Sequence, residues 1–502
     1  MKIFSNQQIQ ELDQQTIQKH YNDSWGLMEK AAKTLFESLE KQELKKDRQT
    51  IIFCGKGNNG GDGLALARIL SDKKYIVKTF LLKATKYSKD NLINQDLLHE
   101  SKFEIQYFNC NEQLHIENDS LIIDALFGTG LQNSLDSEWE NIFNQIQDSN
   151  PYKIISVDLP SGLLNDQAME VNSPCLKSDV CLSFQFPKLA LLLPDNKNRV
   201  DSFRVLDIGL DEATIETMPT SFHFITKELI QSFLKSPNSF SHKGSFGHCI
   251  IIGGSYGSIG APILSAKAAL KSGSGLVTVF APKCAYEIVQ SNINEAFCKT
   301  DPNEHFISSF ESLKKYDSYA IGMGLGSHPQ TAIALKKWLK NAPENSIVLD
   351  ADALNILALE DKPFEWIPKG SVLTPHPKEL ERLISSWEND YEKLKIVKEI
   401  ALKYQLTILI KGAHSSIVCP DGLIYFNSTG NWGMATAGSG DVLSGIIASL
   451  IGQAYSPTQA TIIAVFLHGL AGDFAKLNIH PHSITAGDII NNISNAYFFI
   501  TP

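Results

Sequence analysis

The most informative segment of the chain is a glycine-rich turn that follows a short apolar run, residues 50–54. Gly55, Gly57 and Gly60 stand at the spacing Gly-x-Gly-x-x-Gly, and a helix-like stretch follows them. A strand that ends in glycines before a helix is typical of a phosphate- or nucleotide-binding turn, because the free N–H groups at a helix N-terminus attract anions. The first chemistry that the sequence indicates is therefore the binding of a phosphate-bearing ligand.

The same turn lacks one part of the dinucleotide-binding fingerprint. That fingerprint places an acid about twenty positions on, after the next strand, whereas the apolar run of residues 75–82 is followed by residues 83–89 without a carboxylate. The sequence therefore argues against an ordinary dehydrogenase. What remains is a loop that offers two carboxamides, Asn58 and Asn59, and one acid, Asp62, at the start of a helix.

A second glycine-rich turn, residues 438–440, precedes Asp441 and a long apolar stretch. Backbone N–H groups of such a turn can stabilise developing negative charge while Asp441 takes a proton, which favours phosphoryl transfer. Residues 411–415, Lys-Gly-Ala-His-Ser, offer another anion-binding turn. An ordinary helix cap would use the same residue types. No G-x-x-x-x-G-K-[ST] sequence occurs, so a P-loop enzyme is excluded.

Three acids of the first half stand at or just beyond the ends of apolar runs: Asp62, Asp124 and Asp158. Because the carboxyl ends of parallel strands share one edge of a sheet, where ligands bind, we expect these acids to meet there. Asp158 is placed to act as an acid–base group, although each aspartate could equally cap a helix or stabilise a turn. Lys188, just past a further strand, can meet a phosphate or carboxylate or lie exposed in solvent.

Oxygen-bearing side chains indicate two places for a cation. Asn59, Asp124 and Ser161 offer carboxamide, carboxylate and hydroxyl oxygens, which suit a hard cation. Asp350 and Asp352 follow an apolar run of the second half, where acids can assist a magnesium ion bound to phosphate.

Apolar runs alternate with helix-like segments along the whole chain, which predicts an α/β fold with mostly parallel sheets covered by helices. The runs are residues 50–54, 75–82, 120–124, 153–158, 179–184 and 203–208 in the first half, and residues 248–254, 275–281, 318–322, 346–350, 371–374 and 407–411 in the second. A polar stretch separates the two series, and 502 residues exceed the usual limit of one hydrophobic core. We therefore predict two domains, residues 1–218 and 219–502.

Composition narrows the classes of partner. A formal net charge of -10 argues against binding to nucleic acid or to an anionic membrane, since both need a basic surface. The eight cysteines include no C-x-x-C pair, which predicts neither disulfides nor a zinc site. The chain shows no signal-peptide pattern and no apolar run of the ~18 residues that a membrane span needs. We expect a cytoplasmic enzyme that acts on small molecules.

Along nearly its whole length the chain resembles the bifunctional NAD(P)H-hydrate repair enzymes. The first half is similar to NAD(P)HX epimerase in residues 57–63, 124–130, 157–162 and 186–188, and the second to the ADP- or ATP-dependent NAD(P)HX dehydratases of the ribokinase-like class in residues 242–247, 373–377, 411–412 and 437–441. Several long motifs in one order make the resemblance specific. It implies a Rossmann-like three-layer domain followed by a ribokinase-like domain.

The resemblance implies metabolite repair. The substrate would be NADH or NADPH hydrated at C6 of the nicotinamide ring (NADHX or NADPHX), which exists as two epimers. The first domain would interconvert the S and R forms. The second would phosphorylate the ring hydroxyl of the S form from ADP and eliminate phosphate, which returns the reduced cofactor and leaves AMP. A stereospecific dehydratase alone would strand one epimer.

Site residues follow from the same resemblance, position by position. The epimerase substrate would lie against Asn58, Asn59, Gly60, Gly61, Asp62, Gly128, Thr129, Gly130, Leu131, Gln132, Asn133, Ser134, Asp158 and Lys188, with Asp158 acting near the hydrated ring. Potassium would be bound by Asn59, Asp124 and Ser161. The dehydratase would hold the hydrate with Ala261, Gly326, His376 and Asp441, the last as base, and ADP, accompanied by magnesium, with Lys411, Gly412, Ala413, His414, Ser415 and Gly440.

Two other interpretations stay open. The turn at residues 438–441 is shared across ribokinase-like folds, so the chain could instead be a kinase for a small metabolite or vitamin. The first half could be a non-catalytic nucleotide-binding module. The sequence does not decide between ADP and ATP, between NADHX and NADPHX, or between a monomer and a homo-oligomer.

Overall fold

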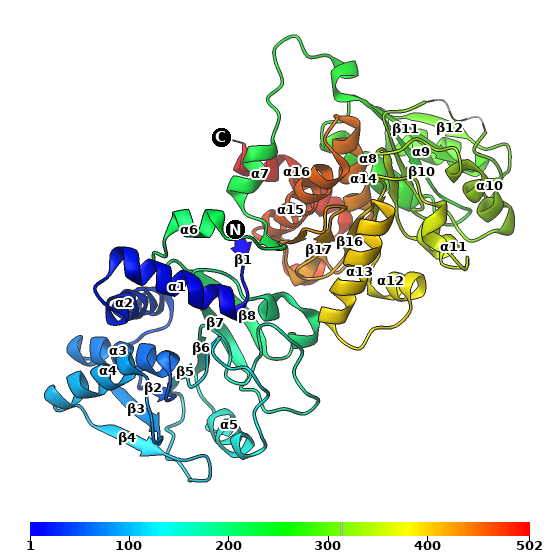
Figure 1. Cartoon of the computed structure of the whole chain (residues 1–502). Helices are drawn as coiled ribbons and strands as arrows, with labels where there is room; N and C mark the ends of the chain where they lie inside the picture. The colour runs from blue at the N-terminus through cyan, green and yellow to red at the C-terminus, as the bar shows by residue number, and fades with distance from the viewer. Residues whose placement is uncertain (312, 314, 502) are drawn as a thin grey trace. The chain divides into compact units, whose positions relative to one another are not determined.

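The computed structural model describes residues 1–311, 313 and 315–501, which form two compact units (Figure 1). The amino-terminal unit consists of Lys2–Thr220 with Asn389–Tyr391. The carboxy-terminal unit consists of Met1, Ser221–Glu388 and Glu392–Pro502. The chain thus passes from one unit to the other between residues 220 and 221.

A seven-stranded sheet forms the centre of the amino-terminal unit, in the order β4-β3-β2-β5-β6-β7-β8, and its neighbouring strands are parallel. The strands are β2 (Thr50–Cys54), β3 (Val77–Leu82), β4 (Ile105–Phe108), β5 (Leu121–Ala125), β6 (Lys153–Val157), β7 (Ser178–Phe184) and β8 (Val200–Leu206). The helices are α1 (Asn6–His20), α2 (Ser24–Gln42), α3 (Asn58–Asp72), α4 (Lys89–Glu100), α5 (Glu138–Asp148) and α6 (Glu212–Thr217). The predicted parallel sheet is confirmed.

Both faces of this sheet are covered, because successive side chains of a strand point to opposite faces. Ile52 and Cys54 of β2 belong to one apolar core with residues of α2, α3 and α4. Ile51 and Phe53 of the same strand belong to another core, with residues of α5. The amino-terminal unit is therefore a three-layer α/β domain, and strands buried on both faces explain why its apolar runs are continuous rather than alternating.

The carboxy-terminal unit contains a longer, mixed sheet in the order β9-β18-β17-β16-β15-β14-β13-β10-β11-β12. Its strands are β9 (Phe222–Phe224), β10 (His248–Ile252), β11 (Leu276–Ala281), β12 (Phe297–Thr300), β13 (Ser318–Ile321), β14 (Ile347–Leu349), β15 (Val372–Leu373), β16 (Thr407–Ile410), β17 (Ser416–Val418) and β18 (Ile424–Phe426). The strand β17 pairs antiparallel with β16 and β18, whereas the other pairs are parallel.

Several helices of this unit pack together as a largely buried layer. They are α7 (Lys227–Phe233), α8 (Gly260–Lys271), α9 (Tyr286–Asn292), α10 (Pro329–Leu339), α11 (Asp352–Leu357), α12 (Pro377–Ile384), α13 (Asp390–Tyr404), α14 (Ser439–Gly452), α15 (Pro457–Lys476) and α16 (Ala486–Ile500). Residues of α8, α14, α15 and α16 share one core with β10 and β11. Figure 1 shows α14, α15 and α16 grouped together, in orange to red. In α14 all residues from Val442 to Gly452 are buried, which explains its unbroken apolar sequence.

Strand order marks one candidate binding site in each unit. The direction of strand addition reverses between β2 and β5 in the first sheet and between β10 and β13 in the second. Ligands of open α/β sheets bind beyond the carboxyl ends of the strands at such a reversal. The glycine turn at residues 55–60 follows β2, and the glycine-rich segments at residues 253–260 and 322–326 follow β10 and β13.

In the part of the chain that the structure describes, no helix combines the length and the apolar character that crossing a bilayer requires.

Candidate active sites

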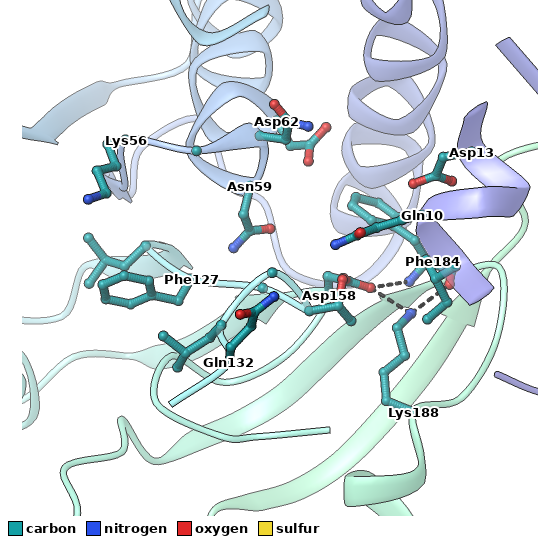
Figure 2. Close-up of a pocket in the computed structure, with 18 of the residues that line it drawn as sticks. Gln10, Asp13, Lys56, Asn59, Asp62, Phe127, Gln132, Asp158, Phe184 and Lys188 are labelled. Carbon is teal, nitrogen blue, oxygen red and sulfur yellow. Dashed lines mark hydrogen bonds and ion pairs between the residues drawn. The ribbon is translucent and has the colours of Figure 1, made fainter. Parts of the chain in front are cut away.

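A cavity of about 680 Å³ lies at the carboxyl ends of the central strands of the amino-terminal unit (Figure 2). The residues predicted for the first substrate site that line it are Asn58, Asn59, Asp62, Gly128, Thr129, Gly130, Leu131, Gln132, Asn133, Ser134, Asp158 and Lys188. These residues come from loops that are far apart in the sequence. A cavity of this size, lined by apolar side chains and several polar and ionisable groups, suits a small polar molecule.

Two glycines predicted to contact the substrate do not line the cavity. A Cβ on Gly60 would lie 1.9 Å from the carbonyl oxygen of Gly55, and a Cβ on Gly61 would lie 2.6 Å from Cε of Met28. Both glycines therefore allow α3 to begin in close contact with its neighbours. Their contribution to the site is the position of the helix N-terminus, whose first N–H groups have no partner within the helix.

Asp158 and Lys188 form an ion pair in the cavity wall, with 2.7 Å between Oδ1 and Nζ. Lys188 is 1% exposed, and its ammonium also donates to the carbonyl oxygen of Phe184 at 2.8 Å. The other oxygen of Asp158, Oδ2, accepts from Oγ1 of Thr129 at 3.2 Å. Asp158 has a φ of +67°, a left-handed conformation that costs energy in most residues and is concentrated at functional sites. The fold thus holds this carboxylate in one orientation at the cavity.

The residues predicted to bind a cation lie around one short loop. The carboxamide of Asn59 is buried, and neither its oxygen nor its nitrogen has a hydrogen-bond partner among the described residues. A Cβ on Gly128 would lie 3.3 Å from Oδ1 of Asn59, while the N–H of Phe127 donates to Oγ of Ser161 at 3.0 Å. The N–H of Ser161 donates to Oδ2 of Asp124 at 2.9 Å. An unsatisfied buried amide costs ~1–3 kcal/mol, so this arrangement fits a cation or a ligand that completes it.

Asp124 is fully buried and does not line the cavity. Burial raises its pKa, and hydrogen bonds from Ser161, Ser156 and the N–H of Leu126 partly oppose this rise. Of the three acids expected to meet at the sheet edge, the structure brings Asp62 and Asp158 into the cavity wall and leaves Asp124 beneath it. A cation beside Asp124 would further favour its charged form.

No sequence pattern predicted the contribution of α1 to the cavity. This helix supplies Ile9, Gln10 and Asp13 to the wall, and Figure 2 shows Gln10 and Asp13 on it. No motif surrounds these residues. The available signal is an acid at the edge of an apolar helical stripe, because Asp13 stands four positions after Ile9 and four before Ile17.

In the carboxy-terminal unit, Lys411, Asp350 and the start of α14 meet at one point. The Nζ atom of Lys411 lies 2.8 Å from Oδ1 of Asp350, whose Oδ2 accepts from Oγ of Ser444 at 2.6 Å. A Cβ on Gly440 would lie 3.4 Å from Nζ of Lys411 and 4.0 Å from Oδ2 of Asp350. Gly438, at a φ of +85°, is the N-cap of α14. The half-buried ammonium of Lys411 thus lies close to a helix N-terminus, an arrangement that suits a phosphate group.

Asp441 lies in the first turn of α14. Burial raises its pKa to about 6; the neighbouring carboxylates Asp350 and Asp352 contribute to the rise and Lys411 opposes it. A carboxyl group with this pKa is largely ionised at neutral pH and is basic enough to accept a proton from a substrate. For Lys411, burial disfavours the charged form, but the carboxylates, Asp350 first, raise its pKa overall.

Ala261 and Gly326 lie on adjacent segments after β10 and β13. A Cβ on Gly324 would come within 3.2 Å of Cβ of Ala261. The N–H of Gly326 donates to Oδ2 of Asp352 at 2.8 Å. The segments that carry these two predicted substrate contacts therefore lie side by side. Gly326 is also hydrogen-bonded to Asp352, one of the acids that follow β14.

His376 serves as the N-cap of α12, where its Nδ1 accepts from the N–H groups of Lys378 and Glu379. Its Nε2 lies 3.4 Å from Oε1 of Glu379, whose Oε2 lies 3.9 Å from Nζ of Lys411. His376 thus caps a helix and is connected through Glu379 to Lys411 of the candidate site. In the turn after β16, Gly412 and Ala413 are exposed, as the backbone of a nucleotide-binding turn must be.

His414 and Ser415 make hydrogen-bond contacts that support the turn after β16. The Nδ1 atom of His414 lies 3.1 Å from the carbonyl oxygen of Asn427, and burial lowers the pKa of the imidazole. Oγ of Ser415 lies 3.1 Å from the N–H of Gly412. No cluster of three or more His, Cys, Asp or Glu side chains suited to a metal ion occurs among residues 1–311, 313 and 315–501.

Comparison with known proteins assigns the family. Residues 24–190 match the YjeF-related protein N-terminus family and residues 249–495 match the NAD(P)H-hydrate dehydratase family. The chain is 34% identical to the bifunctional NAD(P)H-hydrate repair enzyme of Moorella thermoacetica, over 98% of this chain and 96% of that protein. It is 30% identical to the enzyme of the same name from Escherichia coli, over 89% and 84%.

Among solved structures, the Bacillus subtilis ADP/ATP-dependent NAD(P)H-hydrate dehydratase, co-crystallised with ATP and Mg²⁺, is 26% identical and aligns with a TM-score of 0.49 over 55% of this chain and 98% of that chain. The family assignment rests on the curated relatives, which are similar across both units. The chain belongs to the family of bifunctional NAD(P)H-hydrate repair enzymes.

Proposed function

We propose a division of this repair activity between the two units. The amino-terminal cavity interconverts the S and R epimers of NADHX and NADPHX, and the site at the start of α14 dehydrates the S epimer at the expense of ADP. One observation supports both halves: each unit has a carboxyl group near a helix N-terminus and a lysine. Asp158 is paired with Lys188 in the cavity that the start of α3 lines, and Asp441 lies in the first turn of α14 within the electrostatic influence of Lys411. Such a site can bind the phosphates of the substrate and move a proton.

In the proposed dehydration, Asp441 takes the proton of the C6 hydroxyl as that oxygen accepts the β-phosphoryl group of ADP. Lys411 and the N–H groups of α14 near Gly440 stabilise the charge on the transferring group. The lone pair of N1 then expels phosphate from C6, and loss of a proton from C5 restores the reduced ring. The products are NAD(P)H, AMP and phosphate.

Carboxylates around this site suit a hydrated magnesium ion that arrives with ADP. Asp350 and Asp352 both raise the pKa of Asp441 electrostatically, which supports a concentration of negative charge near the proposed phosphate position. Magnesium bound there would neutralise part of the phosphate charge. The protein itself would contribute Lys411 and the orientation of Asp441.

We assign potassium to Asn59, Asp124 and Ser161. The unpartnered carboxamide oxygen of Asn59 and the buried carboxylate of Asp124 support this site, because both gain from a neighbouring cation. Replacing potassium by sodium or lithium should lower epimerisation in the wild type. An Asn59→Ala enzyme that responded to potassium as the wild type does would contradict the assignment.

The decisive assay adds the protein to both NADHX epimers with magnesium and potassium and follows the absorbance of reduced nicotinamide with ADP, with ATP and with neither. Nucleotide-dependent recovery of both epimers supports the proposal and identifies the phosphoryl donor. Recovery of the S epimer alone would reduce the amino-terminal unit to a binding module. A stable phosphorylated product would favour the small-metabolite kinase instead.

A further inference from the structure

An acid lies where α1 turns its apolar side toward the cavity. Ile9 and Leu12 of this helix are buried. Asp13 follows Leu12 and lines the cavity together with Ile9 and Gln10. A carboxyl group at the edge of an apolar surface is costly unless it is paired or protonated, so its presence at this position requires an explanation.

The carboxyl groups of this cavity differ in how they are held. Asp158 has an ion pair with Lys188 and accepts hydrogen bonds. Asp13 and Asp62 line the same cavity, and neither has a hydrogen-bond or ion-pair partner among the residues that the structure describes. In Figure 2 dashed lines reach Asp158 and Lys188 but not Asp13 or Asp62. Two carboxyl groups are thus left for the substrate to satisfy.

Their surroundings favour a bound proton. Burial raises the pKa of Asp13 to about 7, with Asp158 contributing to the rise and Lys188 opposing it. Burial also raises the pKa of Asp62, with contributions from Asp158, Asp13 and Asp90. Each ionised carboxyl group in the cavity disfavours the ionisation of its neighbours. At neutral pH the cavity therefore holds a proton on a carboxyl group while Asp158 stays next to the ammonium of Lys188.

Inversion at C6 needs both a proton acceptor and a proton donor. C6 of the hydrated ring carries the hydroxyl group and N1. When a base removes the hydroxyl proton, the N1–C6 bond can break: the oxygen becomes an aldehyde carbonyl, and N1 keeps the bonding electron pair and takes a proton from an acid. Rotation of the aldehyde and attack of N1 on its other face reverse both proton transfers and give the other epimer. No external reactant is consumed.

We propose that Asp13 is a catalytic acid of the epimerase site and works as a pair with Asp158. Asp158 accepts the proton of the C6 hydroxyl, and Asp13 donates a proton to N1 as the ring opens and takes it back as the ring closes. This assignment rests on the proposed epimerase function of the cavity. It gives α1, a helix outside the recognised glycine turns, a direct part in the reaction.

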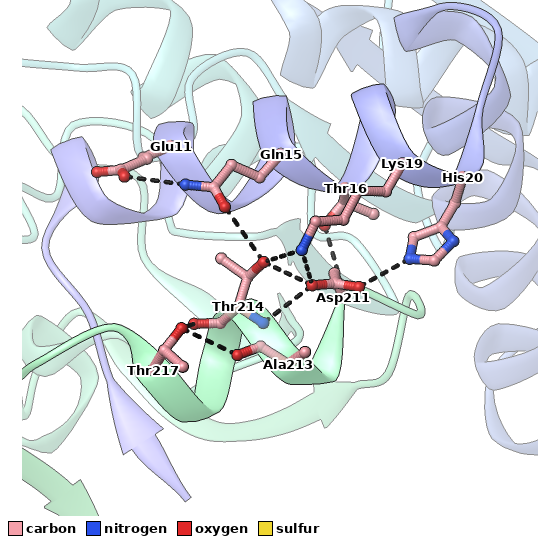
Figure 3. Close-up of polar contacts among 9 residues, drawn as sticks. All are labelled: Glu11, Gln15, Thr16, Lys19, His20, Asp211, Ala213, Thr214 and Thr217. Atoms are coloured by element: carbon pink, nitrogen blue, oxygen red, sulfur yellow. Dashed lines mark hydrogen bonds and ion pairs between the residues drawn. The ribbon is translucent and has the colours of Figure 1, made fainter.

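The fold fixes the helix that carries Asp13. Asp211, the N-cap of α6, accepts from Nζ of Lys19 at 2.6 Å and lies 2.8 Å from Nε2 of His20, both at the C-terminal end of α1 (Figure 3). Oγ1 of Thr214 lies 3.2 Å from Oε1 of Gln15. These contacts anchor α1 to α6, while Asp13 on the same helix lines the cavity.

The test replaces Asp13 by Asn, with Glu11→Gln as a matched control. Glu11 is an exposed acid on the same helix and does not line the cavity. Epimer exchange is followed by chromatography, with the uncatalysed exchange subtracted, and NADHX binding is measured separately. We expect Asp13→Asn to lower kcat for exchange by ~10²–10³-fold, with KM and binding changed less than about threefold. Glu11→Gln should behave as the wild type, and both variants should retain dehydration of the S epimer.

The pH profile gives a second readout. Because Asp13 must carry its proton, wild-type exchange should fall as pH rises through about 7, and Asp13→Asn should lose this dependence. An Asp13→Asn enzyme with wild-type kcat, or with the wild-type fall at high pH, overturns the proposal but leaves the epimerase function intact. Loss of substrate binding together with activity overturns it in favour of a structural role. Wild-type protein that exchanges no epimers overturns the proposed function itself. If Asp13→Asn does not fold, Asp13→Glu should displace the fall at high pH, and an unchanged profile refutes the role.

Discussion

Lys411 and Asp350 in the carboxy-terminal site are joined by a 2.8 Å ion pair, whereas Asn59 and Asp13 at the amino-terminal cavity have no partner among the described residues. In the carboxy-terminal site, Lys411 and Asp350 satisfy each other's charge before a ligand arrives. The amino-terminal cavity contains polar groups, those of Asn59 and Asp13, that an ion, a substrate or a bound proton would have to satisfy. The two units therefore use the same sheet-edge position in two different ways.

The difference follows from the two reactions. Phosphoryl transfer gains from fixed positive charge and N–H groups around the moving phosphate, which Lys411 and the start of α14 would supply in the proposed mechanism. Epimerisation by ring opening transfers no group to or from a second reactant, but it moves protons at the C6 oxygen and at N1, so the groups that exchange these protons must change protonation state during each turnover. An unpaired carboxyl group such as Asp13, whose pKa lies near neutrality, can do this readily, while the ion pair with Lys188 holds Asp158 in one orientation. We infer that the epimerase cavity sacrifices some stability for this property.

The largest expected effect is a separation of the two activities. Asp158→Asn should lower epimerisation by ~10³-fold or more and leave dehydration of the S epimer unchanged, and Asp441→Asn should do the opposite. Asparagine is the appropriate replacement for Asp158 because it tolerates the left-handed backbone at φ +67°. Each activity is measured on pure epimers, with ADP present or absent.

A control guards against simple misfolding. Removing the carboxylate of Asp158 leaves Lys188 buried, although its Nζ still donates to Oγ of Ser183 and to the carbonyl oxygen of Phe184. Circular dichroism should therefore show a folded variant of lower melting temperature. If either substitution abolished both activities in a folded protein, the division of function between the units would be wrong.

The next prediction compares one glycine from each site. A Cβ on Gly440 would meet Nζ of Lys411 only at 3.4 Å, an ordinary contact, so Gly440→Ala should fold normally but occupy the space for phosphate. We expect ~10–100-fold weaker use of ADP, at a scale of ~1–3 kcal/mol, with little change in melting temperature. Gly60→Ala should instead destabilise the protein, because its Cβ would lie 1.9 Å from a backbone oxygen. Similar stability losses in the two variants would contradict this distinction.

The features that depend on local sequence pattern, the buried strands and the glycine turns after them, were predicted correctly. The apolar runs at residues 50–54 and 407–411 correspond to β2 and β16, and the glycine turns lie where strand order places ligands. The antiparallel strands β17 and β18 were not predicted, because each has only three residues and too little sequence to show a period. The position of each site on its sheet was therefore predictable, while the full strand order was not.

The missing part of the epimerase site has a different cause. Asp13 lies on an ordinary amphipathic helix 45 residues before Asn58 and reaches the cavity only because α1 packs against the unit through tertiary contacts. Local sequence gives no measure of such proximity. Likewise, the sequence placed Asp124 among the sheet-edge acids but could not show that it lies under the cavity wall rather than in it.

A smaller effect should appear in stability. The pKa of Asp13 rises from its ordinary value of 3.8 to about 7 in the folded protein, so the folded state holds this proton more tightly and loses stability as pH rises between those values. Asp13→Asn should therefore be more stable than the wild type at pH 8 and show little difference at pH 4. The partly open position of the carboxyl group limits the gain to ~1–2 kcal/mol. Chemical denaturation at both pH values measures it, and a variant less stable at pH 8 would show that Asp13 is a structural group.

The smallest expected effect concerns the anchor of α1. Asp211→Asn keeps the N-cap of α6, since asparagine caps as well as aspartate, but removes the charge that faces Lys19 and His20. The hydrogen bond from Lys19, first among several, lowers the pKa of Asp211, so its contribution to stability is present above the ordinary value of 3.8 and is lost as pH falls below it. The melting temperature of the variant should thus lie slightly below that of the wild type at pH 7, and the two should converge only as pH falls through the lowered pKa of Asp211, well below 3.8.

The half-exposed side chains of Lys19 and His20, at 46% and 52%, keep this stability difference small and sensitive to salt. The Asp211→Asn variant is most informative when its two activities are compared, because α1 carries Asp13 and no residue of α1 is assigned to the dehydratase site. A slightly displaced α1 should lower epimerisation a few-fold and leave dehydration of the S epimer at the wild-type rate. Equal losses in both reactions would mean that the Asp211 contacts support the protein as a whole and do not specifically position the acid of the epimerase cavity.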